Sequence, residues 1–449
     1  MTVLLADTEF ETAPANAVAE FPFARANNLQ RAQKTAPLKS APKSERALKI
    51  LWIADVDYRL GAAHGGNLRL ISFARQVRAQ GHEVYFAVPK RKADDDAEKQ
   101  KFLERLKAQG VITDYFSIEY RHPKVKGKLA HLALYPGAAN LVLGSAQRSF
   151  ADDLNSIISA NPIDVCIFMS RDLLFALPAI GSTTTIVDWV DSYFLYHLRE
   201  ARLHVKRARL SKLLRSMQLA AEAWIHERYY SRQADLSLAV SPVDQRYISR
   251  EPNSQVVANG VASLRAVSVA KTKGQLIFTG NMDFPPNYQS ALWFIDEVFP
   301  LLQQRADIRL VIAGANPVPE LTARANERIQ VTGYVEDLAL QIAQSELYVA
   351  PLVCGSGFKN KVVEAVANGT YVIGTTMAVE FLDSEIRRRL LVADSPRTMA
   401  DAILTYLDSP KAFETNLEEV RRLVAEELTW EAQASELLRL ATLCTRDIE

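Results

Sequence analysis

The sequence contains no apolar run of the roughly 18 to 20 residues that a membrane-spanning helix requires. It begins MTVLLADTEFETAPANAVAEF, where acidic residues occupy the region that would be basic in a secretory signal. We therefore expect a cytoplasmic protein. Contact with the inner face of the membrane as a peripheral protein stays open, because it needs no spanning segment.

Cysteine is also scarce. The three cysteines, Cys166, Cys354 and Cys444, lack the paired spacing of a metal site, and the seven histidines are dispersed with no H-E-x-x-H motif. We therefore expect neither a disulfide framework nor a bound metal, and a reducing compartment suits the thiols. The prediction is that the protein needs no cofactor.

Charge of one sign is not in excess either. The 449 residues have a formal net charge of +1, which argues against nucleic acid as a partner held by bulk electrostatics. With 48% hydrophobic and 23% charged residues, the composition is that of a globular protein. A chain of this length suits two domains.

The first half of the chain alternates predicted strands and helices. Residues 1–46, rich in Ala, Pro, Asn, Lys and Ser, are predicted to be a disordered leader. The run ALKILWIAD then predicts a buried parallel strand, followed by a glycine-bearing loop, a helix over 68–80 and another strand. This order predicts a Rossmann-like domain over 47–262, including a long basic helical stretch over about 198–231.

The second half repeats the alternation. Residues 262–274 lack a periodic apolar pattern, and we expect the interdomain linker there. Strands and helices resume at QLIFTG and predict a second Rossmann-like domain over 275–428. Residues 429–449 predict a helix that packs on either domain. The predicted fold class is therefore α/β, with two Rossmann-like domains facing across a cleft.

The segment PLVCGSGFKNKVVEAVANGTYVIGTT, residues 351–376, carries the clearest chemical signal. It predicts a strand, a turn at Gly355, Ser356 and Gly357, a helix that stops at Gly369, and a second strand. Glycines before a helix leave backbone N–H groups exposed at its positive end, where an anion binds.

Charged side chains occur at the same place. Lys359 and Lys361 add two cations, and a diphosphate is the ligand that suits them. Glu364 follows about one turn later and is placed to accept hydrogen bonds from ribose hydroxyls. Because a glycine turn before a helix is common in α/β proteins, only the combination with two lysines and a glutamate favours a nucleotide site.

Residues 275–376 resemble the C-terminal domain of the family-4 retaining glycosyltransferases, especially the branch acting in polysaccharide and exosortase-linked synthesis. The stretches that carry the resemblance are FTGNMDFPPNYQSALWFIDEVFP, LVIAGANP, VTGYVED, YVAPL and GSGFKNKVVEAVANGTYVIGT. A weaker resemblance extends over about 46–440. It implies the GT-B fold, with a nucleotide-sugar donor on the C-terminal domain and an acceptor on the N-terminal domain.

The resemblance also assigns roles to single residues. Glu364 maps onto the second glutamate of an E-x₇-E pair and would bind the donor ribose, whereas Ser356 stands in place of the first. Many family members carry Arg and Lys in the loop after the first strand of this domain, whereas residues 280–287 have no cation. Lys359 and Lys361 would therefore carry more of the neutralisation of the diphosphate, which would bind beside Gly280. Tyr334 belongs to a turn against which the nucleotide base rests in the family.

Three polar positions near these residues have structural interpretations as well. Asn287 is predicted to be a helix N-cap rather than a ligand. Asp337 either caps the helix after Tyr334 or belongs to the base-binding turn. Asn259, before Gly260, either forms a plain turn or borders the cleft.

In the N-terminal half, Gly65 and Gly66 are predicted to let a loop close over the donor phosphates. His64 and Arg69 flank these glycines, and the preferred interpretation of His64 is structural or solvent-exposed.

Asp188 and Asp191 end a predicted strand, where α/β folds place ligand-facing groups. The resemblance implicates this region in acceptor activation or in stabilising an oxocarbenium ion. We select Asp191, with Lys361 and Glu364, as catalytic. Asp188 lies one alternation earlier and is expected to cap or to pair.

Asp55 and Asp57 form an Asp-x-Asp triplet of the kind that binds Mn²⁺ in GT-A transferases. They follow the first strand, far in sequence from the predicted donor site, so we expect no metal there. A basic run from Arg199 to Arg215 is either a solvated helix face or a surface for anionic lipid headgroups, to which residues Arg121–Lys128 would add.

We therefore predict a metal-independent glycosyltransferase that moves a sugar, with retention, from a nucleotide-sugar donor to a hydroxyl acceptor such as a glycan or lipid-linked glycan. Its setting would be the synthesis of cell-surface polysaccharide or glycoconjugate. Two alternatives stay open. The fold also hosts nucleotide-sugar epimerases and phosphorylases, and Ser356 in place of the first glutamate suits a non-catalytic scaffold of a polysaccharide-assembly complex.

Overall fold

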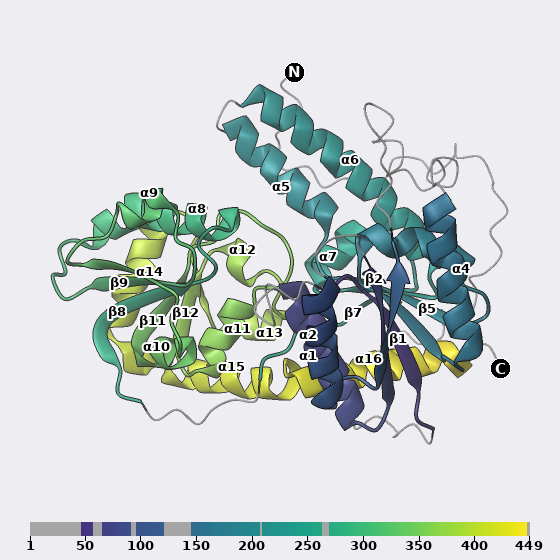
Figure 1. The fold of residues 1–449 in the computed structure, drawn as a ribbon. Coiled ribbons are helices and arrows are strands. Elements are labelled where there is room, and N and C mark those ends of the chain that lie inside the picture. The colour runs from purple at the N-terminus through teal and green to yellow at the C-terminus, as the bar shows by residue number, and fades with distance from the viewer. Residues whose placement is uncertain are drawn as a thin grey trace. The chain divides into compact units, whose positions relative to one another are not determined.

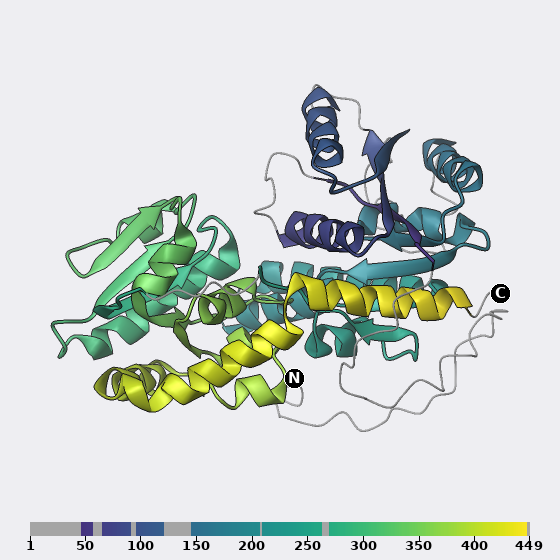
Figure 2. The same cartoon turned by 90° about the horizontal axis from the view of Figure 1, so that it is seen from below.

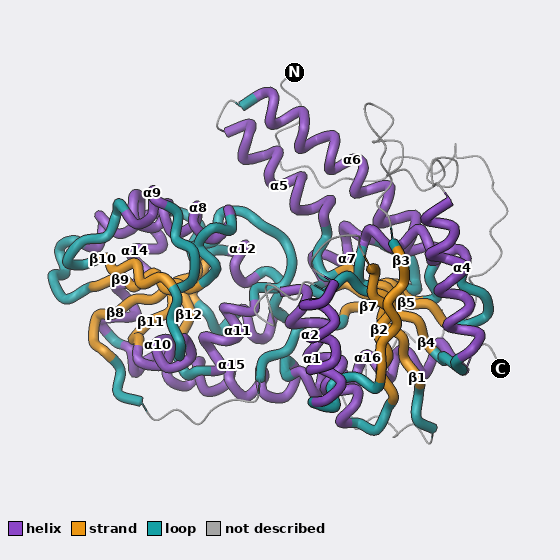
Figure 3. Tube along the Cα trace, in the orientation of Figure 1, coloured by secondary structure: helices purple, strands orange, loops and turns teal. Residues whose placement is uncertain are grey.

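The structure is a computed structural model that describes residues 46–56, 65–90, 96–120, 145–206, 209–262 and 269–446. The predicted leader therefore lies outside the described residues, except for its last position. Asp57, His64 and the basic stretch 121–128 lie outside them too. Two groups of strands, each flanked by helices, make up the described part of the chain (Figure 1, Figure 3).

The first sheet has seven strands from the N-terminal half. In spatial order they are β3 (Asp114–Glu119), β2 (Glu83–Lys90), β1 (Lys49–Ile53), β4 (Val165–Phe168), β5 (Thr184–Trp189), β6 (Leu236–Ala239) and β7 (Ser254–Val256). All neighbours are parallel. The strand order reverses between β1 and β4, and the loops after these two strands diverge there.

The central strands are apolar along their whole length because helices cover both faces of the sheet. In β1, Ile50 and Trp52 belong to one buried cluster, while Leu51 and Ile53 belong to another on the opposite face. The helices of this half are α1 (Gly65–Ala79), α2 (Asp96–Ala108), α4 (Ser145–Ala160), a 3₁₀ segment Arg171–Ala179, α5 (Tyr193–Lys206), α6 (Leu210–Gln233) and α7 (Pro242–Ile248).

The long basic stretch predicted to be helical over about 198–231 is helical in nearly all of its described residues. The stretch forms two helices, α5 and α6, which pack against each other (Figure 1). A sequence rich in Leu, Ala, Lys and Arg has high helix propensity throughout, so propensity alone does not reveal where the chain reverses.

The second sheet has six parallel strands. In spatial order they are β10 (Ile329–Gly333), β9 (Arg309–Ala313), β8 (Thr272–Thr279), β11 (Ser345–Ala350), β12 (Tyr371–Gly374) and β13 (Leu391–Val392). The order reverses between β8 and β11. Strand β8 begins at Thr272, within the stretch predicted as linker.

Helices surround this sheet as well, and one buried cluster of side chains fills its core. They are α8 (Pro285–Trp293), a π segment Phe294–Val298, a 3₁₀ segment Phe299–Leu302, α9 (Pro319–Thr322), α10 (Leu338–Gln344), α11 (Asn360–Ala367), α12 (Thr376–Val379), α13 (Ser384–Arg387), α14 (Pro396–Asp408), a 3₁₀ segment Pro410–Phe413 and α15 (Glu414–Glu427). The prediction of two Rossmann-like α/β domains is confirmed.

The last helix, α16 (Trp430–Arg446), packs on the N-terminal domain, beside α1 (Figure 2). The ring of Trp430 meets that of Phe73 edge-on, with 5.5 Å between centroids. The chain returns to this domain where Val261 pairs with Thr429, and a Cβ on Gly260 would lie 2.2 Å from the backbone nitrogen of Trp430. Only glycine allows the two segments to come so close.

Candidate active site

The two lysines predicted to bind phosphate lie at the reversal point of the second sheet. Residues Gly280–Asn287 follow β8, and residues Gly355–Lys361 follow β11. These neighbouring strands are parallel, so their carboxyl ends share one edge of the sheet, and their loops meet there. This edge is where open α/β sheets bind their ligands.

Lys361 links the two loops. Its Nζ donates to Oδ1 of Asn287 at 2.5 Å and lies 4.8 Å from the centre of the Phe278 ring. A Cβ on Gly280 would lie 2.7 Å from both the Lys361 Nζ and the Asn287 Nδ2, so glycine leaves the space that the lysine occupies. Burial lowers the pKa of Lys361 to about 7.

Asn287 is therefore not the N-cap that the sequence predicted. The N-cap of α8 is Phe284, and the Asn287 side chain instead donates to the carbonyl of Asn281 while accepting from Lys361. Two prolines at the start of α8 explain the difference, because they remove N–H groups that a cap would satisfy. Asn287 is a site residue that the sequence analysis set aside.

The glycine turn is held from within by Lys359. This side chain is 8% exposed, and its Nζ donates to the carbonyl oxygens of Ser356 at 2.5 Å and Gly357 at 2.6 Å. Burial lowers its pKa, although the carboxylates of Asp244 and Asp191 act in the opposite direction. Lys359 thus places a cation under the turn, while Lys361 projects from the first turn of α11.

Carboxylates of the first domain face the same turn. The N–H of Gly357 donates to Oδ1 of Asp244 at 3.3 Å, and a Cβ on Gly357 would lie 1.5 Å from Oδ1 of Asp191. Part of the Asp191 surface is exposed, but protein atoms surround the carboxyl group closely enough to remove much of its hydration. This burial, reinforced by Asp244, raises the pKa of Asp191 to about 7, against the opposing effect of Lys359 and then of Arg69.

Glu364 lies one turn along α11 from Lys361 and is half-buried. Burial raises its pKa, and the nearby Lys361 lowers it. Among the described residues its carboxylate has no hydrogen-bond donor, so its oxygens are available to hydroxyl groups. Burial raises the pKa of Tyr348, and the nearby charge of Glu364 adds to this rise.

Tyr334 has a side chain that is 78% exposed. It follows β10, the edge strand, and Gly333 before it adopts φ 69° and accepts a hydrogen bond from Gly314. Asp337 is the N-cap of α10, with its side chain accepting from the N–H of Leu340. The capping interpretation of Asp337 is thus confirmed.

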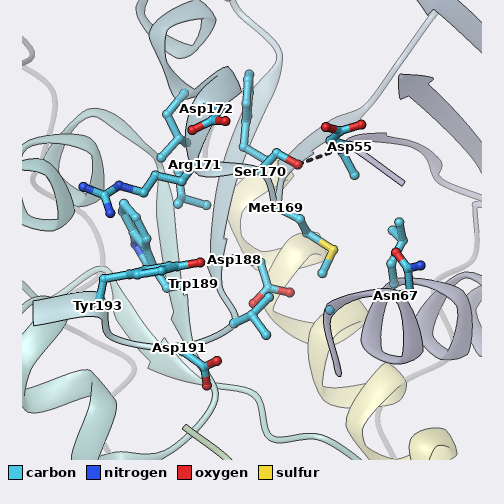
Figure 4. Close-up of a pocket in the computed structure, with 17 residues that line it drawn as sticks. Asp55, Asn67, Met169, Ser170, Arg171, Asp172, Asp188, Trp189, Asp191 and Tyr193 are labelled. Carbon is cyan, nitrogen blue, oxygen red and sulfur yellow. Dashed lines mark hydrogen bonds between the residues drawn. The ribbon is translucent and has the colours of Figure 1, made fainter. Parts of the chain in front are cut away.

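A cavity of about 340 Å³ lies at the corresponding reversal point of the first sheet (Figure 4). It is lined by side chains that follow β1, β4 and β5, among them Asp55, Ser170 and Asp191, together with Gly66 and Asn67 of α1. Its volume is at the lower end of the range for ligand pockets, about 300–1,000 Å³.

Polar and aromatic groups share the walls of this cavity. Figure 4 shows Tyr193 and Trp189 close together, with Arg171 beside the tyrosine ring, at 5.1 Å from its centre. Asp172 and Asp191 add carboxylates. Aromatic faces and hydrogen-bonding groups arranged in this way suit a small polyhydroxylated ligand.

Arg69 is the residue whose importance the sequence analysis missed. Its guanidinium is fully buried and donates to both oxygens of Asp188, at 2.9 Å each, and to Oδ1 of Asn259, also at 2.9 Å. The amide of Asn259 continues to Oδ1 of Asn360, the first residue of α11, at 3.0 Å. Asp188 therefore pairs, as expected, and Asn259 connects the two domains. The sequence signal that could have indicated this role is that Arg69 is a single arginine at a position of its helix that faces the core.

Other predicted residues have structural partners. Asp55 forms an ion pair with Lys99 at 2.9 Å, and no cluster of three metal-ligating side chains occurs among the described residues. Arg199, the first residue of the basic run, is not part of a solvated face. It donates to the carbonyl of Gly355 at 2.7 Å and pairs with Glu380 at the same distance. Gly65 is the first residue of α1.

Residues 273–409 match the sequence family described as glycosyl transferases group 1. The chain is 26% identical to an uncharacterized 44.6 kDa protein in the cps region of Klebsiella pneumoniae, over 29% of this chain and 36% of that protein. It is also 26% identical to the phosphatidyl-myo-inositol mannosyltransferase of Mycobacterium leprae, over 48% of this chain and 59% of the relative. The chain thus spans about a third to three-fifths of these relatives' length.

Solved structures resemble the chain over most of its length. The Anabaena protein Alr3699/HepE in complex with UDP and glucose has a TM-score of 0.56 at 14% identity, with 87% of this chain and 98% of that chain covered. TarM has a TM-score of 0.61 at 10% identity, with 88% and 99% covered. At these identities the likeness concerns the fold. The predicted GT-B fold is confirmed.

Proposed function

We propose that the protein is a glycosyltransferase that moves a sugar from a nucleotide-sugar donor to a hydroxyl group. One observation carries the proposal. Two lysines, two glycine-bearing loops and an available glutamate meet at the reversal point of the second sheet, within the residues that match the glycosyl transferases group 1 family. The GT-B structures in complex with UDP and with UDP-glucose support a nucleotide sugar as donor.

The donor diphosphate binds beside Lys361 in this proposal. Displacing Asn287 from the Lys361 Nζ frees an ammonium group for the phosphate oxygens, and the N–H groups at the start of α11 add partial positive charge. The positive charge of Lys359, beneath the glycine turn, adds to the positive potential at the diphosphate. Glu364 accepts from the ribose hydroxyls, and the turn at Tyr334 supports the base in this proposal. Gly65 and Gly66 let the preceding loop approach the phosphates.

The acceptor hydroxyl enters the cavity of the first domain, where Asp191 stands at the boundary with the glycine turn. A carboxyl group with a pKa of about 7 is suited to accept a proton or to stabilise positive charge on the sugar ring at neutral pH. The lysines stabilise the departing diphosphate, so no metal is needed. Retention of configuration is proposed on the family resemblance.

The acceptor class proposed is a glycan or a lipid-linked glycan, within the synthesis of a cell-surface polysaccharide or glycoconjugate. Two relatives support this proposal. One is a protein of a cps region, and the other is a phosphatidyl-myo-inositol mannosyltransferase. We propose a cytoplasmic location. Within the described residues, none of the helices combines the length and apolar composition needed to cross a membrane.

The test is the release of nucleoside diphosphate from a panel of nucleotide sugars in the presence of EDTA, with glycan and lipid-linked acceptors supplied. Glu364→Ala should lower kcat/KM about 100-fold, because it removes charge-assisted hydrogen bonds to the ribose. Glu320→Ala, an exposed glutamate on α9, is the matched control and should behave as the wild type. Turnover that requires a divalent cation, or a kcat/KM in Glu364→Ala equal to that of the wild type, would contradict the proposed site.

A further inference from the structure

Helix α6 buries several polar side chains and exposes several large apolar ones, unlike most helices that pack on a domain in water. Its buried side includes polar residues, namely Ser216, Glu222, His226, Glu227 and Ser231. Its solvent side carries Leu210, Leu214, Met217 and Trp224, with exposed fractions of 68%, 60%, 56% and 43%. An apolar surface held in water in this way is costly, and it marks an interaction site.

The exposed side chains form one continuous stripe. Their spacing is four, three and seven residues, and exposed Ala221 fills the gap before Trp224. Residues at these intervals lie on one side of a helix. From Leu210 to Trp224 the stripe extends about 21 Å at the helical rise of about 1.5 Å per residue. We call these five residues the α6 stripe.

Hydrogen bonds on the opposite side fix the stripe in its outward position. Ser216 donates to Oε2 of Glu200 on α5 at 2.8 Å. Glu227 accepts from the hydroxyl of Ser192 and from the N–H of Phe194, each at 3.1 Å. Rotating α6 to bury the stripe would break these bonds and expose its buried polar groups, so the helix cannot hide its leucines against its own domain.

The segment from Arg202 to Arg215, which overlaps the first part of the stripe in the sequence, carries exposed positive charge. Arg202, Arg209, Lys212 and Arg215 are exposed, and none of them forms an ion pair within the described residues. The sequence has no acidic residue between Glu200 and Glu222. At the far end of the stripe the Arg228 guanidinium lies 5.0 Å from the centre of the Trp224 ring. The surface thus combines exposed apolar side chains with unneutralised cations.

We infer that the α6 stripe docks on an anionic lipid surface. The leucines and the methionine enter the boundary between headgroups and acyl chains, while the basic side chains extend to the lipid phosphates. Tryptophan is favoured at this same depth. A second copy of the chain is a poorer occupant, because a two-fold contact would place the basic residues of one copy against those of the other.

Docking of this kind places the cavity of the first domain near the membrane. Helix α5 begins at Tyr193, which lines that cavity, and packs along α6. Its 14 residues bridge a length of about 21 Å. An acceptor anchored in the lipid surface would thus be able to reach the cavity of the first domain. The docking surface itself does not rest on the proposed sugar transfer, and it is tested without an activity assay.

The experiment measures partition of the full chain onto vesicles by co-sedimentation, comparing phosphatidylcholine with phosphatidylcholine containing about one-third phosphatidylglycerol. The wild type should bind the anionic vesicles and lose that binding as salt is raised. Lys212→Gln/Arg215→Gln should lower the partition about 25-fold, since each of the two cations contributes about fivefold. Leu214→Ser/Met217→Ser should lower it at least about tenfold without changing the charge.

The matched control is Leu301→Ser, which changes another exposed leucine, 41% exposed, in the second domain. It should leave vesicle binding unchanged. All variants change exposed side chains, and unchanged circular dichroism and Tm verify their folding. Wild-type protein that binds neither vesicle, or stripe variants that bind as the wild type does, would overturn the inference. A stripe variant that converts a dimer to a monomer while vesicle binding persists would assign the stripe to a second copy instead.

Discussion

Arg69 and Asp188 form a fully buried, bidentate ion pair at the centre of the first domain. The two side chains are 0% and 2% exposed, and Nε and Nη2 of the arginine each lie 2.9 Å from a different carboxylate oxygen. The remaining guanidinium hydrogens reach the carbonyls of Val257 and Ala258 and the side chain of Asn259. One arginine thus joins α1, the end of β5 and the segment that leads to the second domain.

Arg69→Met should destabilise the protein by about 3–5 kcal/mol, because it leaves the Asp188 carboxylate buried without its partner. Urea denaturation measures the loss. The double variant Arg69→Met/Asp188→Leu removes both charges and should recover much of the stability. A double variant no more stable than the single one would show that the hydrogen bonds to residues 257–259, rather than the ion pair, hold this region.

Lys361 should make donor binding depend on pH. Its pKa of about 7 in the free protein should rise when a diphosphate binds, so binding takes up a proton. Donor affinity should then be greatest below pH 7 and fall by at most about tenfold per pH unit as the pH rises above 7. Calorimetry with the nucleotide sugar measures it. Lys361→Arg keeps its charge at all these pH values and should bind with a flatter profile. A variant with the wild-type slope would assign the titration to another group.

Asp191→Asn should lower kcat by about 10² to 10⁴, the usual contribution of a positioned acid or base, while donor affinity changes little. In the wild type, kcat/KM should fall as the pH drops through about 7, because the carboxyl group becomes protonated there. Asp172→Asn, in the same cavity, is the matched control and should affect acceptor KM rather than kcat. Equal effects at the two positions would contradict a special role for Asp191.

Asp244 provides a second test of the same carboxyl group. Its charge raises the Asp191 pKa, after the larger effect of burial. Asp244→Asn should therefore move the acidic limb of the kcat/KM profile to lower pH. A limb that stays in place would show that another group titrates near pH 7, with Glu227 a candidate because burial raises its pKa to about 7.

Gly357→Ala should abolish turnover and lower stability. The residue has a φ of 76°, and the added methyl would overlap the Asp191 carboxylate. Gly369→Ala is the control for backbone strain alone, because Gly369 has a φ of 75° with no atom within 4 Å of the added carbon. Gly369→Ala should lose about 1–2 kcal/mol in stability from strain and retain activity, whereas Gly357→Ala should lose more because the overlap adds to the strain. Equal loss of activity in both would attribute the effect to strain.

The sequence by itself determined the local elements and the donor-binding segment. Apolar runs such as that of β1 predict buried strands, and the glycine turn, Lys359, Lys361 and Glu364 lie within a few residues of one another. Short separations of this kind are fixed by the turn and the first turn of α11, so their proximity follows from helix geometry.

Only the tertiary structure decided which distant groups meet. Asn287 reaches Lys361 across 74 residues, Asp244 reaches Gly357 across 113, and Arg69 reaches Asp188 across 119. Such pairs depend on strand order, which places loops of distant strands at one sheet edge and leaves no periodic trace in the sequence. The exposure of the α6 stripe is likewise decided by the tertiary structure. Periodicity shows that one side of a helix is apolar, but only the packing of Glu200, Ser192 and Phe194 against its polar side turns that stripe to the outside.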